Sequence, residues 1–246
     1  MFKQQMKRVV VTALTVVLIS GGALAGNLPM DEANAKQAAE LIAAMFVAGL
    51  GVVAKHQGLI NDPEKGDKGF TPEYVEGQIR EQFKEMTGTE LDAAQPDEVK
   101  AALMATLEAS NQGVKNNQQR INRKGVEFKG FIPAVYGRVT GNILKGRTGI
   151  AVKQTTFQFR NAYNEPDEFE SSILKKFEDG SISKGQGVGE RVGDSYRYLR
   201  PVYIKEACLK CHGDPKGELD IAGKPKEGYK LGDLRGAISV QVPITK

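Results

Sequence analysis

Both cysteines of the 246-residue chain and one of its two histidines lie within five consecutive positions, Cys208-Leu209-Lys210-Cys211-His212. This spacing is the attachment sequence of c-type haem. Two thiols separated by two residues reach the two vinyl groups on one edge of a porphyrin from a single helical turn. The next residue, a histidine, then lies beneath the ring, where its imidazole binds the iron. We therefore predict one covalently attached haem c, with thioether links at Cys208 and Cys211 and with His212 as an axial ligand.

Other interpretations of the cysteine pair fit the sequence less well. A zinc site needs four ligands, and the chain offers three adjacent ones here and His56 elsewhere. A thioredoxin-like redox pair stands ahead of a helix in a βαβ context, which the flanking sequence lacks. A disulfide between Cys208 and Cys211 would close a very small loop and add little stability. Chance rarely places one of two histidines directly after the second cysteine.

The sequence leaves the second axial ligand of the iron open. His56 is the remaining histidine, and it falls on the same face of an expected helix as Met45, Gly49 and Val53. Histidine is the commonest metal ligand, but near a helix end it also interacts favourably with the helix dipole. Met45 is a weaker candidate, because methionine at helical spacing usually belongs to a core. Gly49 would permit the close approach of a porphyrin or of another helix, and water or an open position completes the alternatives.

A segment rich in tyrosine and arginine precedes the haem motif and contains Tyr196, Arg197, Tyr198, Arg200 and Tyr203. Arginine and tyrosine side chains are candidates to pair with haem propionates, because they donate hydrogen bonds to carboxylates. The alternative is that these residues alternate along a strand and face solvent.

The first 25 residues have the pattern of a secretory signal peptide. Lys3, Lys7 and Arg8 form a basic start, residues 9–19 form an apolar run, and an Ala-x-Ala cleavage site ends at Ala25. A retained membrane anchor is the alternative, but it needs ~20 apolar residues, and this run is shorter. We expect cleavage after Ala25 and a periplasmic protein, because c-type haem is attached outside the cytoplasm.

Composition limits the possible partners. The chain has 34 basic and 30 acidic residues, and three of the basic ones belong to the leader, so the mature chain has a net charge of +1. No basic stripe with interleaved aromatic residues is present, which argues against a nucleic-acid partner. No other uncharged segment reaches the length of a membrane span, so we expect no stable membrane span after cleavage.

The two halves of the mature chain differ in their hydrophobic pattern. Helical periodicity and capping residues dominate residues 31–145, whereas short alternating segments dominate residues 150–246. The first expected helix begins at 32 and stops between 58 and 63. The other expected helices are 72–86, 97–111 or beyond, 133–144 and 165–177, and the expected strands are 150–159, 185–191, 195–204 and 236–244. Helices followed by a small antiparallel sheet predict an α+β fold. We expect one domain over residues 26–246, with an N-terminal helical layer.

Short motifs also surround the haem site. They are Leu59-Ile60-Asn61-Asp62, Lys68-Gly69-Phe70-Thr71, Phe131-Ile132-Pro133-Ala134, Arg160-Asn161, Asn164-Glu165-Pro166, Tyr196-Arg197-Tyr198, Arg200-Pro201, Gly232-Asp233, Gly236-Ala237-Ile238-Ser239-Val240 and Pro243. With these motifs the mature chain resembles an exported family of single-haem c-type domains with a PAS-like sensor fold, found alone or fused to chemoreceptors and histidine kinases. The resemblance implies an antiparallel sheet that carries the haem, with Cys208, Cys211 and His212 as its ligating residues. Some members supply a cysteine from the N-terminal helix as the other axial ligand. This chain has no third cysteine, so that role does not carry over.

These observations predict a periplasmic monohaem c-type cytochrome that exchanges single electrons with a redox partner protein. The alternative is a haem-based sensor of redox state or of NO, CO or O2 that acts through a partner such as a membrane sensor. We expect no enzymatic role, because the sequence shows no distal acid–base constellation.

Overall fold

The computed structural model describes residue 26, residues 28–93 and residues 95–245. The expected signal peptide, residues 1–25, lies outside the described residues. The helices are α1 (Glu32–Lys55), α2 (Gln57–Ile60), α3 (Pro72–Thr87), α4 (Asp97–Ile121), α5 (Pro133–Thr148), α6 (Glu168–Glu178) and α7 (Glu206–His212), with a 3-10 turn at Ala162–Asn164. The strands are β1 (Ala151–Thr155), β2 (Val188–Val192), β3 (Ser195–Tyr203) and β4 (Leu234–Pro243).

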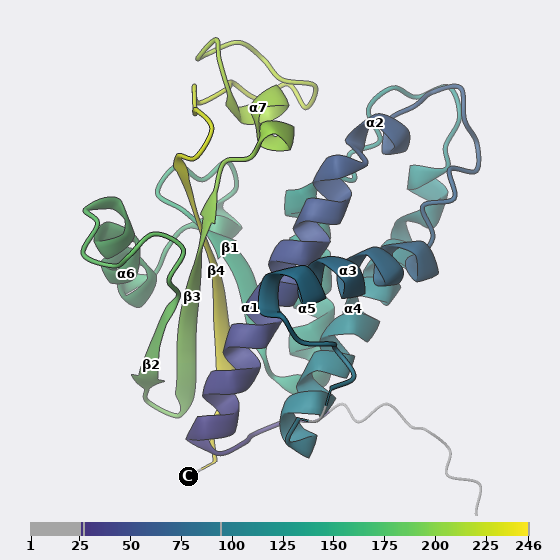
Figure 1. The fold of residues 1–246 in the computed structure, drawn as a ribbon. Helices are drawn as coiled ribbons and strands as arrows, with labels where there is room; N and C mark the ends of the chain where they lie inside the picture. Colours follow the sequence, from purple (N-terminus) through teal and green to yellow (C-terminus); the bar gives the residue numbers. More distant parts are fainter. Residues whose placement is uncertain (1–25, 27, 94, 246) are drawn as a thin grey trace, which may run out of the picture.

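The four strands form one antiparallel sheet in the order β1-β4-β3-β2. The last strand, β4, is therefore central, and its Val240 lies opposite Val152 of β1 and Tyr198 of β3. Helix α1 packs on β3 and β4, and α5 packs on β1, while α6 contacts β3 and β4. Figure 1 shows α6 on the side of the sheet away from α1. The α+β class and the N-terminal helical layer predicted from the sequence are confirmed.

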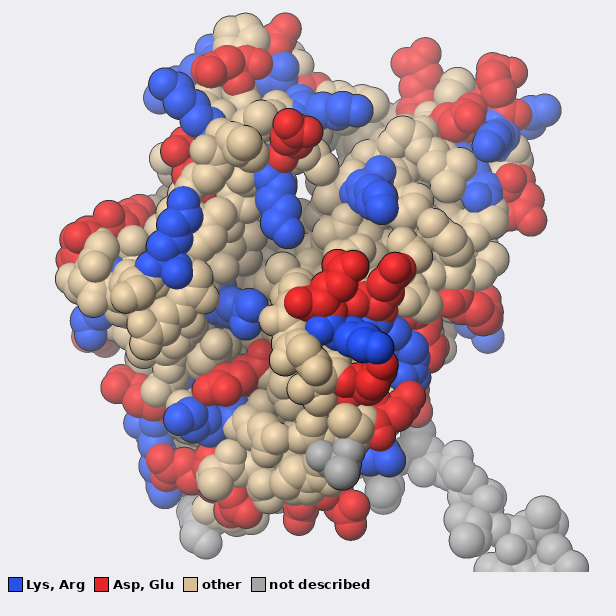
Figure 2. Space-filling view, viewed as in Figure 1, with Lys and Arg blue, Asp and Glu red and all other residues tan. Residues whose placement is uncertain are grey.

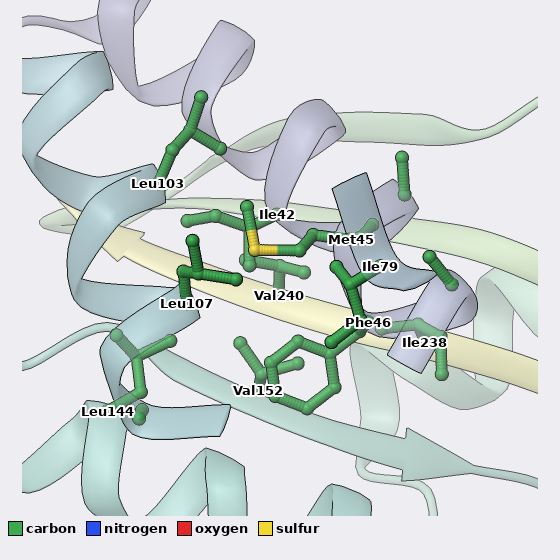
Figure 3. Packing of buried hydrophobic residues seen from close by; sticks show 14 of the residues in the cluster. Ile42, Met45, Phe46, Ile79, Leu103, Leu107, Leu144, Val152, Ile238 and Val240 are labelled. Atoms are coloured by element: carbon green, nitrogen blue, oxygen red, sulfur yellow. The ribbon is translucent and has the colours of Figure 1, made fainter. Parts of the chain in front are cut away.

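The sheet has an apolar cluster on each face. On the α1 side, Ile42, Met45 and Phe46 pack with residues of the helical layer and with Val240 (Figure 3). On the other side, α6 packs against Leu199 and Ala237. The buried face of α6 consists of Ile173, Leu174 and Phe177. Because β4 is covered on both faces, its sequence is a nearly continuous run of apolar residues and does not alternate between apolar and polar residues.

Helix α1 begins where the sequence predicts. Asp31 caps it, with Oδ1 accepting a hydrogen bond from the amide of Asn34 at 2.8 Å. Gly49 permits close contact with α5, because a Cβ atom there would lie 2.2 Å from Oη of Tyr136. Met45 is 2% exposed in the core. The neighbour that Gly49 accommodates is therefore another helix, and Met45 has a packing role.

Among the described helices, α1 alone is long and apolar enough to cross a membrane, and 67% of its most apolar stretch is buried inside the structure. Its packing against α3, α4, α5 and the sheet accounts for that composition.

Some element ends differ from the sequence prediction. Helix α1 stops at Lys55, and the separate turn α2 follows. Helix α4 continues to Ile121, so the amide-rich residues 116–119 belong to it. Strand β1 stops at Thr155 rather than near Phe159, since Thr156 accepts a hydrogen bond from the amide of Gln158 with its side chain and the chain turns.

Candidate haem-binding site

The cysteine motif forms helix α7, within the connection between β3 and β4 (Figure 1). Cys208 and Cys211 are three positions apart and therefore lie on one face of this helix. Both are free, partly exposed thiols. The helix ends at His212, and Gly213 is its C-terminal cap. The amide of Gly213 donates to the carbonyl of Leu209 at 2.9 Å, and a Cβ atom at this position would lie 2.7 Å from that oxygen. The structure thus places the three predicted haem residues together.

Glu227 sets the protonation form of His212. Partial burial tends to raise the pKa of Glu227, but hydrogen bonds from Arg160 and His212 outweigh it and lower that pKa to about 2. An ionised carboxylate only accepts hydrogen bonds, so Nδ1 of His212 donates to Oε2 of Glu227 at 2.8 Å. Nε2 then carries the lone pair, and no described residue forms a hydrogen bond with it.

The imidazole of His212 is also kept neutral. Burial, followed by the positive charge of Arg235, lowers the pKa of His212 below its usual 6.5, against the opposing effect of Glu227. A neutral imidazole with one nitrogen held by a carboxylate and the other free is the form in which histidine binds a metal.

Arg160 holds this arrangement from the segment after β1. Its Nε donates to Oε1 of Glu227 at 2.6 Å, and its Nη2 donates to Oε2 of the same carboxylate at 2.7 Å. The same Nη2 donates to the carbonyl of Cys211 at 2.7 Å, and Nη1 donates to Oδ2 of Asp220 at 2.7 Å. Its Nη2 also lies 3.1 Å from the carbonyl oxygen of Pro225, so one guanidinium connects α7 to three residues of the loop that follows it.

Backbone hydrogen bonds close the loop of residues 213–233 at its base. The amide of Ile204 donates to the carbonyl of Asp233 at 2.8 Å, and the amide of Gly232 donates back to Ile204 at 2.9 Å. Further along, the amide of Tyr229 donates to the carbonyl of His212 at 2.9 Å. The ends of β3 and β4 thus fix where α7 and Glu227 lie relative to each other.

The available donor set fits a porphyrin better than a bare metal ion. Within the described chain, no group of three or more His, Cys, Asp or Glu side chains is placed to hold a metal ion, which gives the zinc interpretation no support. A porphyrin brings its own four nitrogen ligands and asks the protein for one or two more. Burial, with Asp220 as the next cause, raises the pKa of Cys211 above its usual 9.0. That thiol is therefore protonated at neutral pH.

The surface beside α7 is hollowed. Figure 2 shows a hollow between the lobe that contains α7 with its loop and the lobe at the C-terminal end of α1. Helices α1 and α7 contact each other, so the hollow is bounded by the helical layer as well as by the haem helix.

His56, the predicted sixth ligand, lies at the same end of the molecule but is engaged elsewhere. It forms the C-terminal cap of α1. Its Nδ1 lies 2.7 Å from the carbonyl oxygen of Val52, and its Nε2 lies 2.8 Å from Oη of Tyr74. The ring also packs against Phe70, with 5.4 Å between centroids. Ligation by His56 would require Nε2 to leave Tyr74, and this role stays a prediction.

A comparison with known protein families shows the family of this chain. The sequence model of the Tll0287-like family matches residues 89–243, more than half of the chain. The chain belongs to the Tll0287-like family. The crystal structure of the cyanobacterial haem protein Tll0287 aligns at 18% identity over 62% of this chain and 99% of that one, with a TM-score of 0.43. No curated protein sequence matches. The family resemblance identified in the sequence is thereby confirmed.

The segment that matches the Tll0287-like family contains the whole arrangement around α7. Arg160, Cys208, Cys211, His212 and Glu227 all fall inside residues 89–243. His56 falls outside it, at the C-terminal end of α1, before the matched residues. Family membership therefore does not extend to His56, whose ligation of the iron stays a prediction.

The tyrosine and arginine side chains of β3 are mostly engaged within the fold. Tyr196 and Tyr198 are buried in the core, which contradicts the alternative that they face solvent. Arg197 pairs with Asp167 at 2.7 Å. Arg200 shares the strand face of Tyr198 by alternation, and it remains a candidate for a haem propionate.

Asp220 and Glu227 were not predicted from the sequence, and no role was predicted for Arg160. Glu227 follows His212 by 15 positions, and Arg160 precedes Cys211 by 51. No helical or strand period relates residues so far apart. The available signal was the Arg160-Asn161 motif, which contributed to the family resemblance but does not reveal the contacts of its arginine.

An open groove of about 680 Å³ lies elsewhere, on the surface of α3 and α4. Its lining includes Glu73, Glu76, Asn111 and Lys115, and it includes no residue of α7 or of the loop after it. This groove is separate from the haem site.

Proposed function

We propose that this Tll0287-like chain binds one haem c on α7 and acts as a periplasmic monohaem cytochrome that transfers single electrons. One observation carries the proposal: His212 has Nδ1 held by ionised Glu227 and Nε2 free, directly after two free thiols on one helical face. Haem binding by the related protein Tll0287 supports it.

Each residue has a defined part in holding the group. The thiols of Cys208 and Cys211 would add across the two vinyl groups, each forming a C–S bond and passing its hydrogen to the vinyl carbons. Nε2 of His212 would bind the iron. When bound, the haem supplies a one-electron couple, which the protein tunes through the axial ligands and their hydrogen bonds. Arg200 would pair with a propionate from the strand face that packs on α1.

Export and partners follow from the same proposal. The segment of residues 1–25 would direct the chain to the periplasm, where the haem is attached, and a redox protein would supply or accept the electron. No enzymatic role is proposed. The N-terminal sequence of the purified mature protein tests export: we expect it to begin after Ala25, and an intact leader would contradict this part of the proposal.

Spectra of the reduced protein with and without CO or NO test the electron-transfer role. Two tightly held axial ligands leave no position for a gas, so we expect the haem bands to stay unchanged. Rapid CO or NO binding would contradict this prediction and would assign the haem to sensing of a small gas through a partner protein.

A further inference from the structure

We propose that Glu227 is a positioning residue that gives His212 partial imidazolate character and thereby lowers the reduction potential of the haem. This inference rests on the proposed function, since it concerns the residue behind the axial ligand. It assigns the tuning of the potential to a side chain 15 positions away from the haem motif.

The geometry holds the carboxylate in one orientation. Oε2 accepts from Nδ1 of His212 at 2.8 Å, while the guanidinium of Arg160 binds both carboxylate oxygens, at 2.6 Å and 2.7 Å. The side chain of Glu227 is 13% exposed. Rotation of the carboxylate away from His212 would break all three hydrogen bonds, so it stays aimed at Nδ1.

A charged acceptor at Nδ1 makes the opposite nitrogen a stronger donor. The hydrogen bond draws the Nδ1 proton toward Glu227 and shifts electron density to Nε2, which raises the basicity of the ligand. A charge-assisted hydrogen bond in a poorly solvated site is stronger than one in water. A more basic ligand stabilises the more positive Fe(III) state over Fe(II), and the reduction potential falls.

Neighbouring cations limit the size of the effect. Arg160 contacts both oxygens of the carboxylate, and Arg235 lies 3.9 Å from Oε1. Asp220 binds Arg160 in turn and offsets part of its charge. Loss of a hydrogen-bonding partner of a metal-bound histidine typically costs about 10- to 100-fold in metal affinity or activity. Because these cations partly neutralise Glu227, we expect an effect on the Fe(III)/Fe(II) equilibrium of about tenfold, the lower end of that range.

Glu227→Gln in the haem-loaded protein tests the inference. Glutamine keeps the size and the acceptor oxygen but removes the charge. We expect the Fe(III)/Fe(II) equilibrium to shift about tenfold toward Fe(II), which is a rise of about 59 mV in the midpoint potential of a one-electron couple. The electron paramagnetic resonance g values of the low-spin ferric haem, which respond to the basicity of the axial imidazole, should shift as well.

Glu218→Gln is the matched control. It removes one negative charge from the same loop, but Glu218 is 53% exposed and pairs with Lys226 rather than with His212. Solvent screens such a charge. We therefore expect the Fe(III)/Fe(II) equilibrium of Glu218→Gln to stay within twofold of that of the wild type.

Equal potentials for Glu227→Gln and Glu218→Gln, with His212 still bound to the iron, would overturn the inference. Should Glu227→Gln not accumulate, Glu227→Asp is the second test. Withdrawing the carboxylate by one methylene should shift the Fe(III)/Fe(II) equilibrium toward Fe(II) by less than tenfold, and no shift would overturn the inference. Wild-type protein without haem would instead refute the proposed function. A haem-loaded protein whose potential ignores Glu227 refutes this inference alone.

Discussion

Cys208 and Cys211 lie three positions apart on one face of α7, which is the spacing that the proposed covalent attachment of haem requires. Replacing both with serine should abolish covalent attachment, because serine hydroxyls do not form thioethers. The measurement is haem staining of the denatured protein on a gel, and we expect complete loss of the signal. Covalent haem retained by the double variant would contradict the assignment.

Lys210→Ala is the control for that experiment. Lys210 lies between the two cysteines and is exposed, so the substitution perturbs the same helix without removing a thiol. We expect staining at the wild-type level. Loss of staining in this variant would indicate that folding of α7, rather than the thiols, limits attachment.

At the scale of elements, the contact of α1 with α5 depends on Gly49. An alanine Cβ there would lie 2.2 Å from Oη of Tyr136, whose hydroxyl is hydrogen-bonded to Ser110 at 2.7 Å in the core. Gly49→Ala should therefore lower the free energy of unfolding by about 1–3 kcal/mol, the usual cost of overpacking a core. Urea denaturation measures this.

Gly77→Ala is the matched substitution on α3. This glycine is exposed, and nothing lies within 4 Å of the position that an alanine Cβ atom would take. We expect an increase of about 0.5–1 kcal/mol in the free energy of unfolding, because alanine favours the helix over glycine. Equal effects of the two alanines would contradict the packing account.

Helix α6 has a cap that responds to pH. Asp167 and Glu170 form a capping box, with Oδ1 of Asp167 accepting from the Glu170 amide at 2.9 Å. Partial burial tends to raise the pKa of Asp167, but hydrogen bonds from Arg197 and the Glu170 amide outweigh it and hold that pKa below 3.8. A depressed pKa contributes stability that is present above pH 3.8 and is lost as the pH falls through the folded-state pKa.

Two substitutions of Asp167 separate its charge from its cap. Asp167→Asn keeps the cap and loses the ion pair, so we expect a loss of about 0.5 kcal/mol at neutral pH that disappears in acid. Asp167→Ala also loses the cap, which should cost about 1 kcal/mol more at every pH. Urea unfolding at neutral pH and in acid measures both, and a loss for Asp167→Asn that does not change with pH would contradict the assignment.

The starts of most helices were easier to predict than their ends. Asp31, Pro72 and Pro133 mark helix starts through local chemistry that the sequence displays. The end of α4 is not marked in this way, because the amide-rich residues 116–119 suit either a helix surface or a loop. Strand β1 was predicted too long because Phe157 and Phe159 continue its alternation although both are exposed.

On the scale of the whole molecule, the C-terminal end of α1 and helix α7 lie at the same end, so the helical layer is in a position to influence the haem (Figure 1). If His56 is the sixth ligand, His56→Ala should shift the Soret band and the midpoint potential. Unchanged values for both would exclude His56 as a ligand.

Tyr74→Phe tests the same idea from the opposite direction. The hydroxyl of Tyr74 holds Nε2 of His56 at 2.8 Å and therefore competes with the iron for it. Removing this hydroxyl should increase the concentration of added imidazole that is needed to displace His56 from the iron, as followed in the absorption spectrum. A decrease would mean that Tyr74 helps to position the ligand instead.

Some residues of the candidate site are close in sequence, and others meet only in the folded chain. Cys208, Cys211 and His212 were predictable because a single helical turn brings them together. Glu227 and Arg160 were not, since they meet His212 only after β1, β3 and β4 have paired and the loop of residues 213–233 has closed. The burial of Tyr196 and Tyr198 likewise depends on which sheet face α1 covers, which strand alternation alone does not specify.

The central claim is that a single haem is fixed covalently to α7. Intact-mass spectrometry of the exported protein, produced in cells that carry out c-type haem maturation, tests it most directly. We predict a mass equal to the polypeptide without residues 1–25 plus one haem, with the added mass located by proteolysis on the peptide that contains Cys208 and Cys211. A fully matured polypeptide with no added haem would contradict the account.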